Sequence, residues 1–216
     1  MKGLGSWAPG PALLGVGALA LVGLGGCTVG EGTGSVKTDR LYISDCWNGP
    51  FDLQPDFFAA NPYRKEQLLI RVQRGDNNQE ASDGLTVVVS DLEAVKGMLG
   101  QPIPVGLPIG VAPPGYPVTG GPPTLVSLSL YLHKTCHEQN SATYSVSGDI
   151  TFHSIFSGDP NEKNTDARLT DASFTVKFAD PRELVEAPDP DAVTSDVVTG
   201  DFNFFFQRGQ PAQPFQ

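Results

Sequence analysis

Apolar and polar residues alternate one by one in four segments of the second half of the chain, 124–133, 144–153, 173–178 and 201–206. A period of two is the period at which successive side chains of a β-strand point to opposite faces. One phase of each segment holds aliphatic and phenylalanine side chains, and the other holds mostly Ser, Thr, Asp, Asn and His. Four such strands joined by polar loops predict an antiparallel sheet with one solvent-exposed face.

The first half predicts three more strands and one helix. Strands are expected at 39–46, 67–73 and 85–90, and the last of these is Val-rich and therefore central. A capping box that starts at Ser90 and an apolar stripe behind it predict a short helix. About seven strands and one short helix favour a mostly β fold, an antiparallel β-sandwich, with a partly closed β-barrel as the alternative.

Three segments lack a regular period. Residues 47–50 are expected to form a turn, and 51–63 an irregular segment with one short helical turn after Pro55. Eight prolines in 101–123 exclude a central strand or a helix and predict a long extended connection. Aromatic side chains gather in the first two segments, where they either close one end of the domain or offer a surface to a glycan or partner protein. They are Trp47, Phe51, Phe57, Phe58 and Tyr63.

The N-terminus has a different pattern. Lys2 gives a positive start, and residues 12–24 form an uncharged apolar run that ends in small residues. The run is short for a bilayer span, which needs roughly 20 apolar residues, so a cleaved secretory signal is favoured. The alternative is a transmembrane anchor, but Pro and Gly at 9–11 interrupt the apolar stretch and no basic cluster follows it.

The stretch Leu24-Gly25-Gly26-Cys27 resembles the lipobox of bacterial lipoproteins: an aliphatic residue and two small residues before the cysteine that receives lipid. The resemblance covers the N-terminal stretch alone. It implies cleavage before Cys27, diacylglycerol on its sulfur, and an acyl chain such as palmitate on its amine. Two or three chains anchor a protein stably, whereas one binds only marginally. Thr28 rather than Asp follows the cysteine, which in familiar two-membrane bacteria implies an outer-membrane destination.

These expectations divide the chain into three parts. They are a signal peptide at 1–26, a lipidated cysteine with a flexible tether at 27–35, and a single β-rich domain at 36–216. The mature chain would keep all 24 acidic residues and all but one of the 14 basic residues. Nucleic acid and anionic headgroups select basic patches, so neither is an expected partner. We expect the contact with the lipid bilayer to come from the Cys27 anchor.

Two cysteines remain once Cys27 carries lipid. Outside the cytoplasm, Cys46 and Cys136 most simply form a disulfide. It would close a loop of roughly 90 residues, worth about 4 to 5 kcal/mol in the chain-entropy model. The alternative is two unpaired buried thiols.

The histidines supply a candidate metal site. His133 and His137 are four residues apart, and His153 lies on the polar phase of the next expected strand, where His133 is its possible cross-strand neighbour. Together with Glu138 they would offer zinc-type ligands. The alternative is that the three histidines bind no metal and lie on the solvent-exposed face of the sheet.

Two acidic loops are candidate calcium sites. One is 76–80, and the other spans 159–166 with acidic and amide side chains at nearly alternate positions. Neither has the full EF-hand pattern, and Asn and Asp are also what turns require. The chain contains no Gly-x-Ser-x-Gly, His-Glu-x-x-His or phosphate-loop motif.

The sequence therefore favours a membrane-anchored envelope lipoprotein that binds or scaffolds, with no cofactor besides its covalent lipid. One alternative is an envelope hydrolase or metal-dependent enzyme using His133, His137 and His153. Another is a structural component of the envelope. The partner, protein or glycan, is not specified by the sequence.

Overall fold

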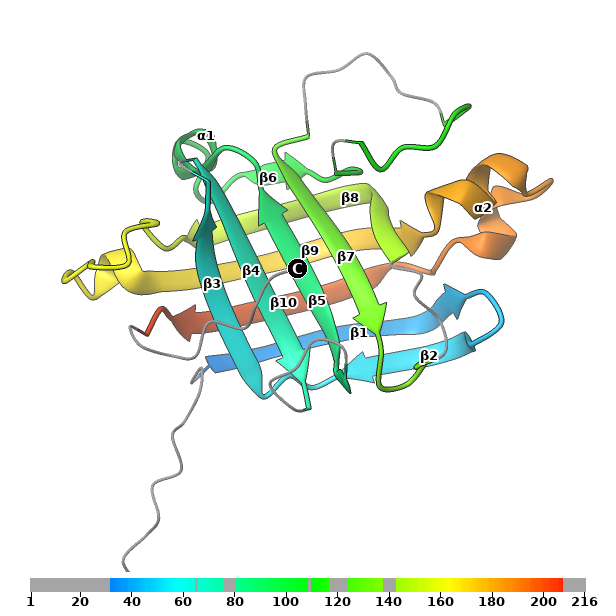
Figure 1. The fold of residues 1–216 in the computed structure, drawn as a ribbon, viewed down its shortest axis with the longest axis horizontal. Coiled ribbons are helices and arrows are strands. Elements are labelled where there is room, and N and C mark those ends of the chain that lie inside the picture. The colour runs from blue at the N-terminus through cyan, green and yellow to red at the C-terminus, as the bar shows by residue number, and fades with distance from the viewer. Residues whose placement is uncertain are drawn as a thin grey trace, which may run out of the picture.

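A computed structural model describes residues 32–64, 66–75, 81–108, 110–116, 124–137 and 143–207. These residues form one antiparallel sheet that curls over itself into a half-barrel (Figure 1). The mostly β antiparallel fold that the sequence predicts is confirmed. The described residues contain ten strands rather than about seven, and two short α-helices rather than one.

The elements follow one another in this order. The strands are β1 (Gly32–Ile43), β2 (Trp47–Leu53), β3 (Phe57–Tyr63), β4 (Gln67–Arg74), β5 (Asp83–Val89), β6 (Pro102–Pro104), β7 (Val126–Leu132), β8 (Thr143–Ser154), β9 (Leu169–Ala179) and β10 (Val198–Phe205). The helices are α1 (Leu92–Lys96) and α2 (Pro181–Glu186), with 3-10 turns η2 (Asp166–Arg168) and η3 (Pro190–Val193).

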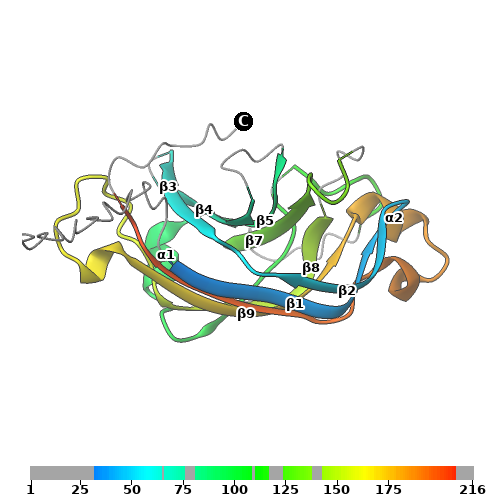
Figure 2. The ribbon, with the colours of Figure 1, turned by 90° about the horizontal axis from the view of Figure 1, so that it is seen from below.

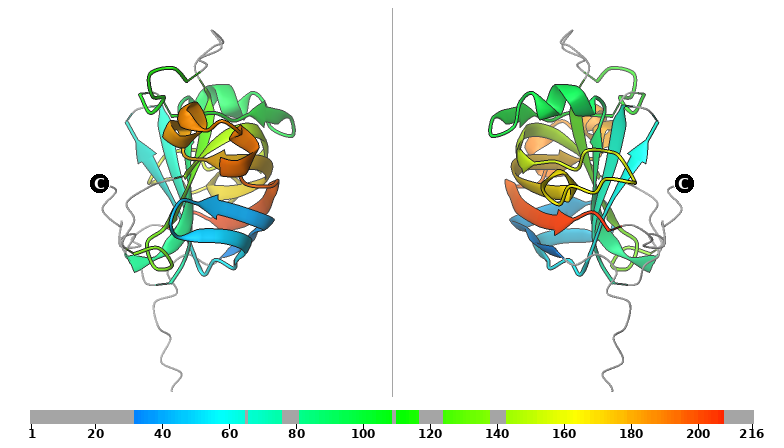
Figure 3. Two further views of the ribbon diagram at one scale, coloured as in Figure 1. Left: turned by 90° about the vertical axis from the view of Figure 1, so that its right-hand side faces the viewer. Right: turned by 90° about the vertical axis from the view of Figure 1, so that its left-hand side faces the viewer.

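The strand order is β2-β1-β10-β9-β8-β7-β5-β4-β3, and β6 pairs with β8 outside this path. The ladder is thinnest between β7 and β8, where only Ser129↔Tyr144 and Leu130↔Thr143 are in register. The sheet folds over at that point, so that β3, β4, β5 and β7 face the layer of β8, β9, β10, β1 and β2 (Figures 2 and 3). The fold thus combines the two layers of a sandwich with the continuous ladder of an open barrel.

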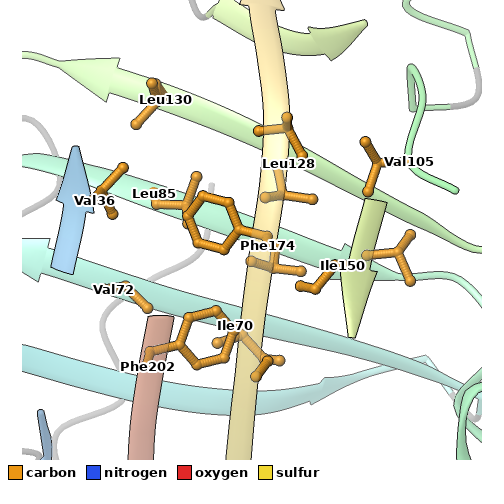
Figure 4. Close-up of a cluster of buried hydrophobic side chains, with 14 of the residues drawn as sticks. Val36, Ile70, Val72, Leu85, Val105, Leu128, Leu130, Ile150, Phe174 and Phe202 are labelled. Carbon is orange, nitrogen blue, oxygen red and sulfur yellow. The ribbon is translucent and has the colours of Figure 1, made fainter. Parts of the chain in front are cut away.

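The core lies between the two layers. Figure 4 shows side chains from both layers meeting there, among them Val72 and Leu85 from one and Phe174 and Phe202 from the other. The alternation predicted for three segments of the second half is confirmed at its centre: Phe152, Phe174 and Phe204 are buried, and their neighbours Thr151, Thr175 and Asn203 are more accessible.

The outer face of the layer formed by β3, β4, β5 and β7 is not the solvent-exposed surface that the alternation predicted. Tyr131 on β7 and Gln73 on β4 are buried. The Tyr131 hydroxyl donates to Gln73 Oε1 at 2.9 Å, and Gln73 Nε2 donates to Ser82 Oγ at 3.0 Å. Polar side chains on this face satisfy one another, which lowers the cost of removing them from water.

The turn expected at 47–50 and the irregular segment at 51–63 are wrong. These residues form β2 and β3, the two edges of the sheet path. Pro50 and Pro62 argue against strands here, because proline lacks the N–H that a central strand needs. An edge strand tolerates proline, and both β2 and β3 are edge strands. Of the aromatic residues in these two segments, Phe58 is part of the core, Phe57 is also buried, Trp47 and Phe51 are half-buried against the core, and Tyr63 is exposed.

The expected tether at 27–35 is too long, because β1 already begins at Gly32, which pairs with Phe204 of β10. A Cβ on Gly32 would lie 2.8 Å from the Phe58 ring, and one on Gly34 would lie 3.1 Å from it. Glycine at these positions makes room for a packed ring from the opposite layer.

The expected helix is present as α1, but its N-cap is Asp91, whose Oδ1 accepts from the Ala94 amide at 2.9 Å. Ser90 instead donates its hydroxyl to the Thr124 carbonyl at 3.1 Å. The proline-rich connection contains the three-residue strand β6, which lies outside the main path and buries Ile103.

Candidate functional site

The predicted disulfide is confirmed. Cys46, in the turn after β1, is bonded to Cys136, in the turn after β7, with their Cα atoms 5.8 Å apart. Asp83 holds the second turn: its Oδ1 accepts from the amides of Lys134 and Thr135, each at 3.0 Å. The bond therefore ties the two layers of the sheet together, and the alternative of two free thiols is wrong.

The structure does not bring the three histidines together. The register places Leu130 of β7 beside Thr143 of β8, and His153 lies ten residues further along β8, roughly 33 Å away at the rise of a strand. His133 instead lies near Leu130, against the ring of Tyr131. The cross-strand pairing expected for His133 and His153 is therefore wrong. The sequence shows which residues form each strand, but it does not show the register in which β7 and β8 pair.

The other candidate ligands give no metal centre among the described residues. No group of three His, Cys, Asp or Glu side chains in that part of the chain is arranged to hold an ion. His137 is exposed, and His153 Nε2 lies 3.4 Å from Ser173 Oγ. Glu138 and the acidic loop 76–80 lie outside the described residues.

The acidic loop at 159–166 uses its oxygens to form turns. Asp159 Oδ1 accepts from the Asn161 amide at 2.8 Å, and Glu162 Oε1 accepts from the Asn164 amide at 2.9 Å. Bonding to Asn164 lowers the pKa of the Glu162 carboxyl. These contacts are the side-chain turns that Asp, Asn and Glu form with amides two residues ahead.

An apolar pocket of about 410 Å³ lies at the end of the molecule that carries α2. Its walls come from α2, the 110–116 segment, the start of β8 and η3. The described residues that line it are Gly115, Tyr116, Val146, Leu184, Val185 and Pro190.

A β-bulge supplies one wall of this pocket. The register between β8 and β9 shifts between Ser145 and Ser147, so Val146 opposes no single residue of β9. The bulge also reverses the phase of the strand: Ser145 is buried, whereas Tyr144 is only half-buried. The unbroken alternation expected over 144–153 puts Tyr144 and Val146 on the same inward phase as Ile150 and Phe152, and the bulge makes that expectation wrong. Bulges commonly redirect a side chain next to a binding or active site.

Asp180 fixes the helix that forms the second wall. It is the N-cap of α2, and its Oδ1 accepts from the Arg182 amide at 2.8 Å, while its Oδ2 lies 2.6 Å from Arg182 Nη2. Pro181 follows at the first helical position, where its missing N–H costs nothing. The cap and the ion pair together hold Leu184 and Val185 at the pocket.

Arg40 of β1 fixes the wall that contains Pro190. Its Nη2 donates to the carbonyls of Asp191 at 2.8 Å and Thr194 at 2.5 Å. The Thr194 hydroxyl in turn donates to the Pro190 carbonyl at 2.7 Å. The loop that presents Pro190 to the pocket is thereby bound to the sheet.

The pKa values of three side chains in and near the pocket determine which of them are charged at neutral pH. Burial raises the pKa of Tyr116. Burial also raises the pKa of Tyr144, with Asp180 adding to the rise and Arg182 opposing it. For Asp180, burial pushes the pKa upward, but the hydrogen bonds and charge of Arg182 outweigh burial and the net pKa is lowered. Both phenols therefore keep their protons, and Asp180 stays ionised.

A second hollow, of about 510 Å³, lies over the bulge between β1 and β2. Its walls include Lys37, Asp39, Asp52 and the exposed Val197. Lys37 Nζ lies 3.7 Å from Asp52 Oδ2, and both side chains are about half exposed, at 55% and 49%. Charged side chains line this hollow, whereas the described lining of the pocket beside α2 holds no charged residue, so the pocket beside α2 is the better candidate for a site that takes an apolar group.

The sequence held a signal for one wall of the pocket. Asp180-Pro181-Arg182-Glu183 combines an N-cap, proline at the first helical position and an acidic first turn, which together indicate a helix start. The bulge at Val146 left no such signal, because valine fits the apolar phase of an unbroken strand.

Within the described residues, no helix is long and apolar enough to cross a membrane. The chain matches no protein-family model, no curated protein and no solved structure.

Proposed function

We propose that this protein is a lipid-anchored binding module of the bacterial cell envelope that takes an apolar group of its partner into the pocket beside α2. The anchor is the acylated Cys27 of the lipobox-like stretch, and the destination that Thr28 implies is the outer membrane. The Cys46–Cys136 disulfide supports export, because such bonds persist in oxidising compartments and are rare in the cytoplasm.

The pocket beside α2 is the observation that carries the binding role. Val146, Leu184, Val185 and Pro190 offer apolar contact, and Tyr116 adds a protonated phenol that can donate a hydrogen bond. Binding sites are typically concave and apolar with a few placed polar groups. The described lining holds no His, Cys or carboxylate, so its chemistry suits holding an apolar group.

The character of the lining also favours one class of partner. A glycan presents hydroxyls and needs polar partners, whereas the described part of this lining is aliphatic apart from one tyrosine. We therefore favour a partner protein or an amphipathic small molecule that inserts an apolar group.

The test compares three substitutions in the domain without its anchor, residues 28–216. Val185→Asp places a charge in the pocket, Val197→Asp places one in the second hollow, and Leu99→Asp does so at neither. The three side chains are similarly exposed, at 41%, 49% and 42%, so the folding cost is matched. Binding of a neutral naphthylamine dye, followed by fluorescence, is expected to fall with Val185→Asp alone. Equal binding by all three variants would contradict the pocket assignment.

A further inference from the structure

The start of β1 limits how far the domain can stand from its anchor. Gly32 is five residues after Cys27, and an extended chain spans at most about 3.6 Å per residue, so this linker reaches about 18 Å or less. Gly32 pairs with Phe204, and Phe205 pairs with Leu169. A lipid on Cys27 therefore holds the membrane near the end of the sheet where β1 and β9 begin and β10 ends.

The apolar pocket lies at the opposite end. β9 runs from Leu169 at the anchored end to Ala179, which at the rise of a strand is a length of roughly 33 Å. α2 follows β9 directly, starting at Pro181. Figure 1 shows α2 at one end of the long axis, and the start of β1 and the end of β10 at the other.

A fixed aromatic side chain is exposed at the anchored end. Phe205 is 42% exposed, whereas Phe206 next to it stacks on Phe156 with ring centroids 4.1 Å apart. The Phe206 carbonyl accepts from Arg168 Nε at 2.8 Å. The backbone beside Phe205 is thus held in place, and the ring stays turned outward. Amphipathic and aromatic side chains gain free energy at the boundary between headgroups and acyl chains.

We infer that the end of the domain around Phe205 rests on the bilayer surface and that the pocket beside α2 points away from it. The inference rests on the proposed anchor at Cys27, and it names the second surface through which the protein meets lipid. The anchored end gives the domain a fixed orientation, in which a partner reaches the pocket from the side opposite the membrane.

The test places one tryptophan at either end of β10 in the full lipidated chain. Trp47 would be the one tryptophan left after cleavage before Cys27, and it is replaced by Phe in both variants. Phe205→Trp and Val197→Trp are matched, because the two positions are 42% and 49% exposed and flank the same strand. Each variant is bound to phosphatidylcholine vesicles whose acyl chains carry bromine, a quencher of tryptophan fluorescence, close to the headgroup.

We expect bromine to reduce the fluorescence of Phe205→Trp several-fold and to leave that of Val197→Trp unchanged. Quenching of both variants alike, or of neither while the protein floats with the vesicles, would overturn the orientation and leave the anchor standing. A protein that carries no lipid on Cys27 and does not float would overturn the proposed function itself, and the orientation with it.

Discussion

At the scale of single residues, one glycine determines how polar side chains pack on the outer face of the layer formed by β3, β4, β5 and β7. Gly84 on β5 is directly opposite Tyr131 on β7, and the Tyr131 ring crosses it to reach Gln73. Burial raises the pKa of Tyr131, with Arg71 opposing and Asp83 adding to the rise, so the phenol keeps its proton and donates to Gln73 Oε1. The space above Gly84 is therefore part of a buried hydrogen-bonded cluster.

Gly84→Ala is expected to destabilise the domain by about 1 to 3 kcal/mol, the usual cost of overpacking. The added Cβ would lie 2.6 Å from Tyr131 Cζ and 2.9 Å from the Val72 carbonyl. Gly49→Ala is the control, because nothing lies within 4 Å of its added Cβ. Urea unfolding of the two variants measures the contrast, and an equal effect of both would contradict this packing.

Asp180 gives the pocket a predictable response to pH. Its pKa is lowered in the folded state, so its ionised form contributes stability above the unfolded pKa of about 3.9, and this contribution is lost as pH falls through the lower folded pKa. Asp180→Asn keeps the cap bond to the Arg182 amide but removes the charge. Its destabilisation, measured by urea unfolding, should be clear at pH 7 and shrink toward zero as the pH falls below the folded value. A destabilisation that is constant with pH would show that the Arg182 pair contributes nothing.

At the scale of elements, the period of two predicted correctly which side chains face inward wherever a strand has no bulge. The inward phase of β9 and β10 was readable, because Phe174 and Phe204 keep their alternation along the whole strand. The phase of β8 was predicted correctly only between its two register shifts, at Ser145/Ser147 and Phe152/Ser154, since each extra residue moves the side chains beyond it to the other face. The edges β2 and β3 were hidden by their prolines, which local rules assign to turns.

The register itself gives a sharp test. Phe152→Ala or Phe204→Ala should cost about 3 to 5 kcal/mol, because each removes a fully packed ring. Thr151→Ala and Asn203→Ala, on the adjacent outward positions, should cost about 1 kcal/mol or less. Thermal unfolding of the four variants distinguishes the two sets, and equal sensitivity would mean that these strands are buried on both faces.

The disulfide joins elements that the sequence keeps far apart. Cys46 and Cys136 are separated by 90 residues, so reduction should destabilise the domain by up to about 4 to 5 kcal/mol. We expect non-reducing peptide mapping to recover one linked pair, and reduction to lower the melting temperature. Two alkylatable thiols in protein taken from an oxidising compartment would rule the bond out.

At the scale of the whole molecule, the sequence predicted the class of fold but not the placement of its sites. Composition and alternation were sufficient for an antiparallel β domain, since each strand carries its own pattern. Which strands become neighbours depends on contacts between distant segments, as when the chain places β10 between β1 and β9. The histidine site failed and the α2 pocket was missed for this reason, because both depend on register and on the way the sheet folds over.

The proposed orientation of the domain, with its pocket away from the membrane, depends on the acylation of Cys27. The most direct measurement is mass spectrometry of the N-terminal tryptic peptide from membrane-extracted protein. We predict a peptide of residues 27–37 that begins at Cys27 and carries diacylglycerol and an acyl chain, since Lys37 is the first tryptic site after the cysteine. Cys27→Ser should lack this peptide and should not incorporate fatty acid. An unmodified peptide that runs through Cys27, or fatty-acid label that persists on Cys27→Ser, would contradict the lipoprotein assignment.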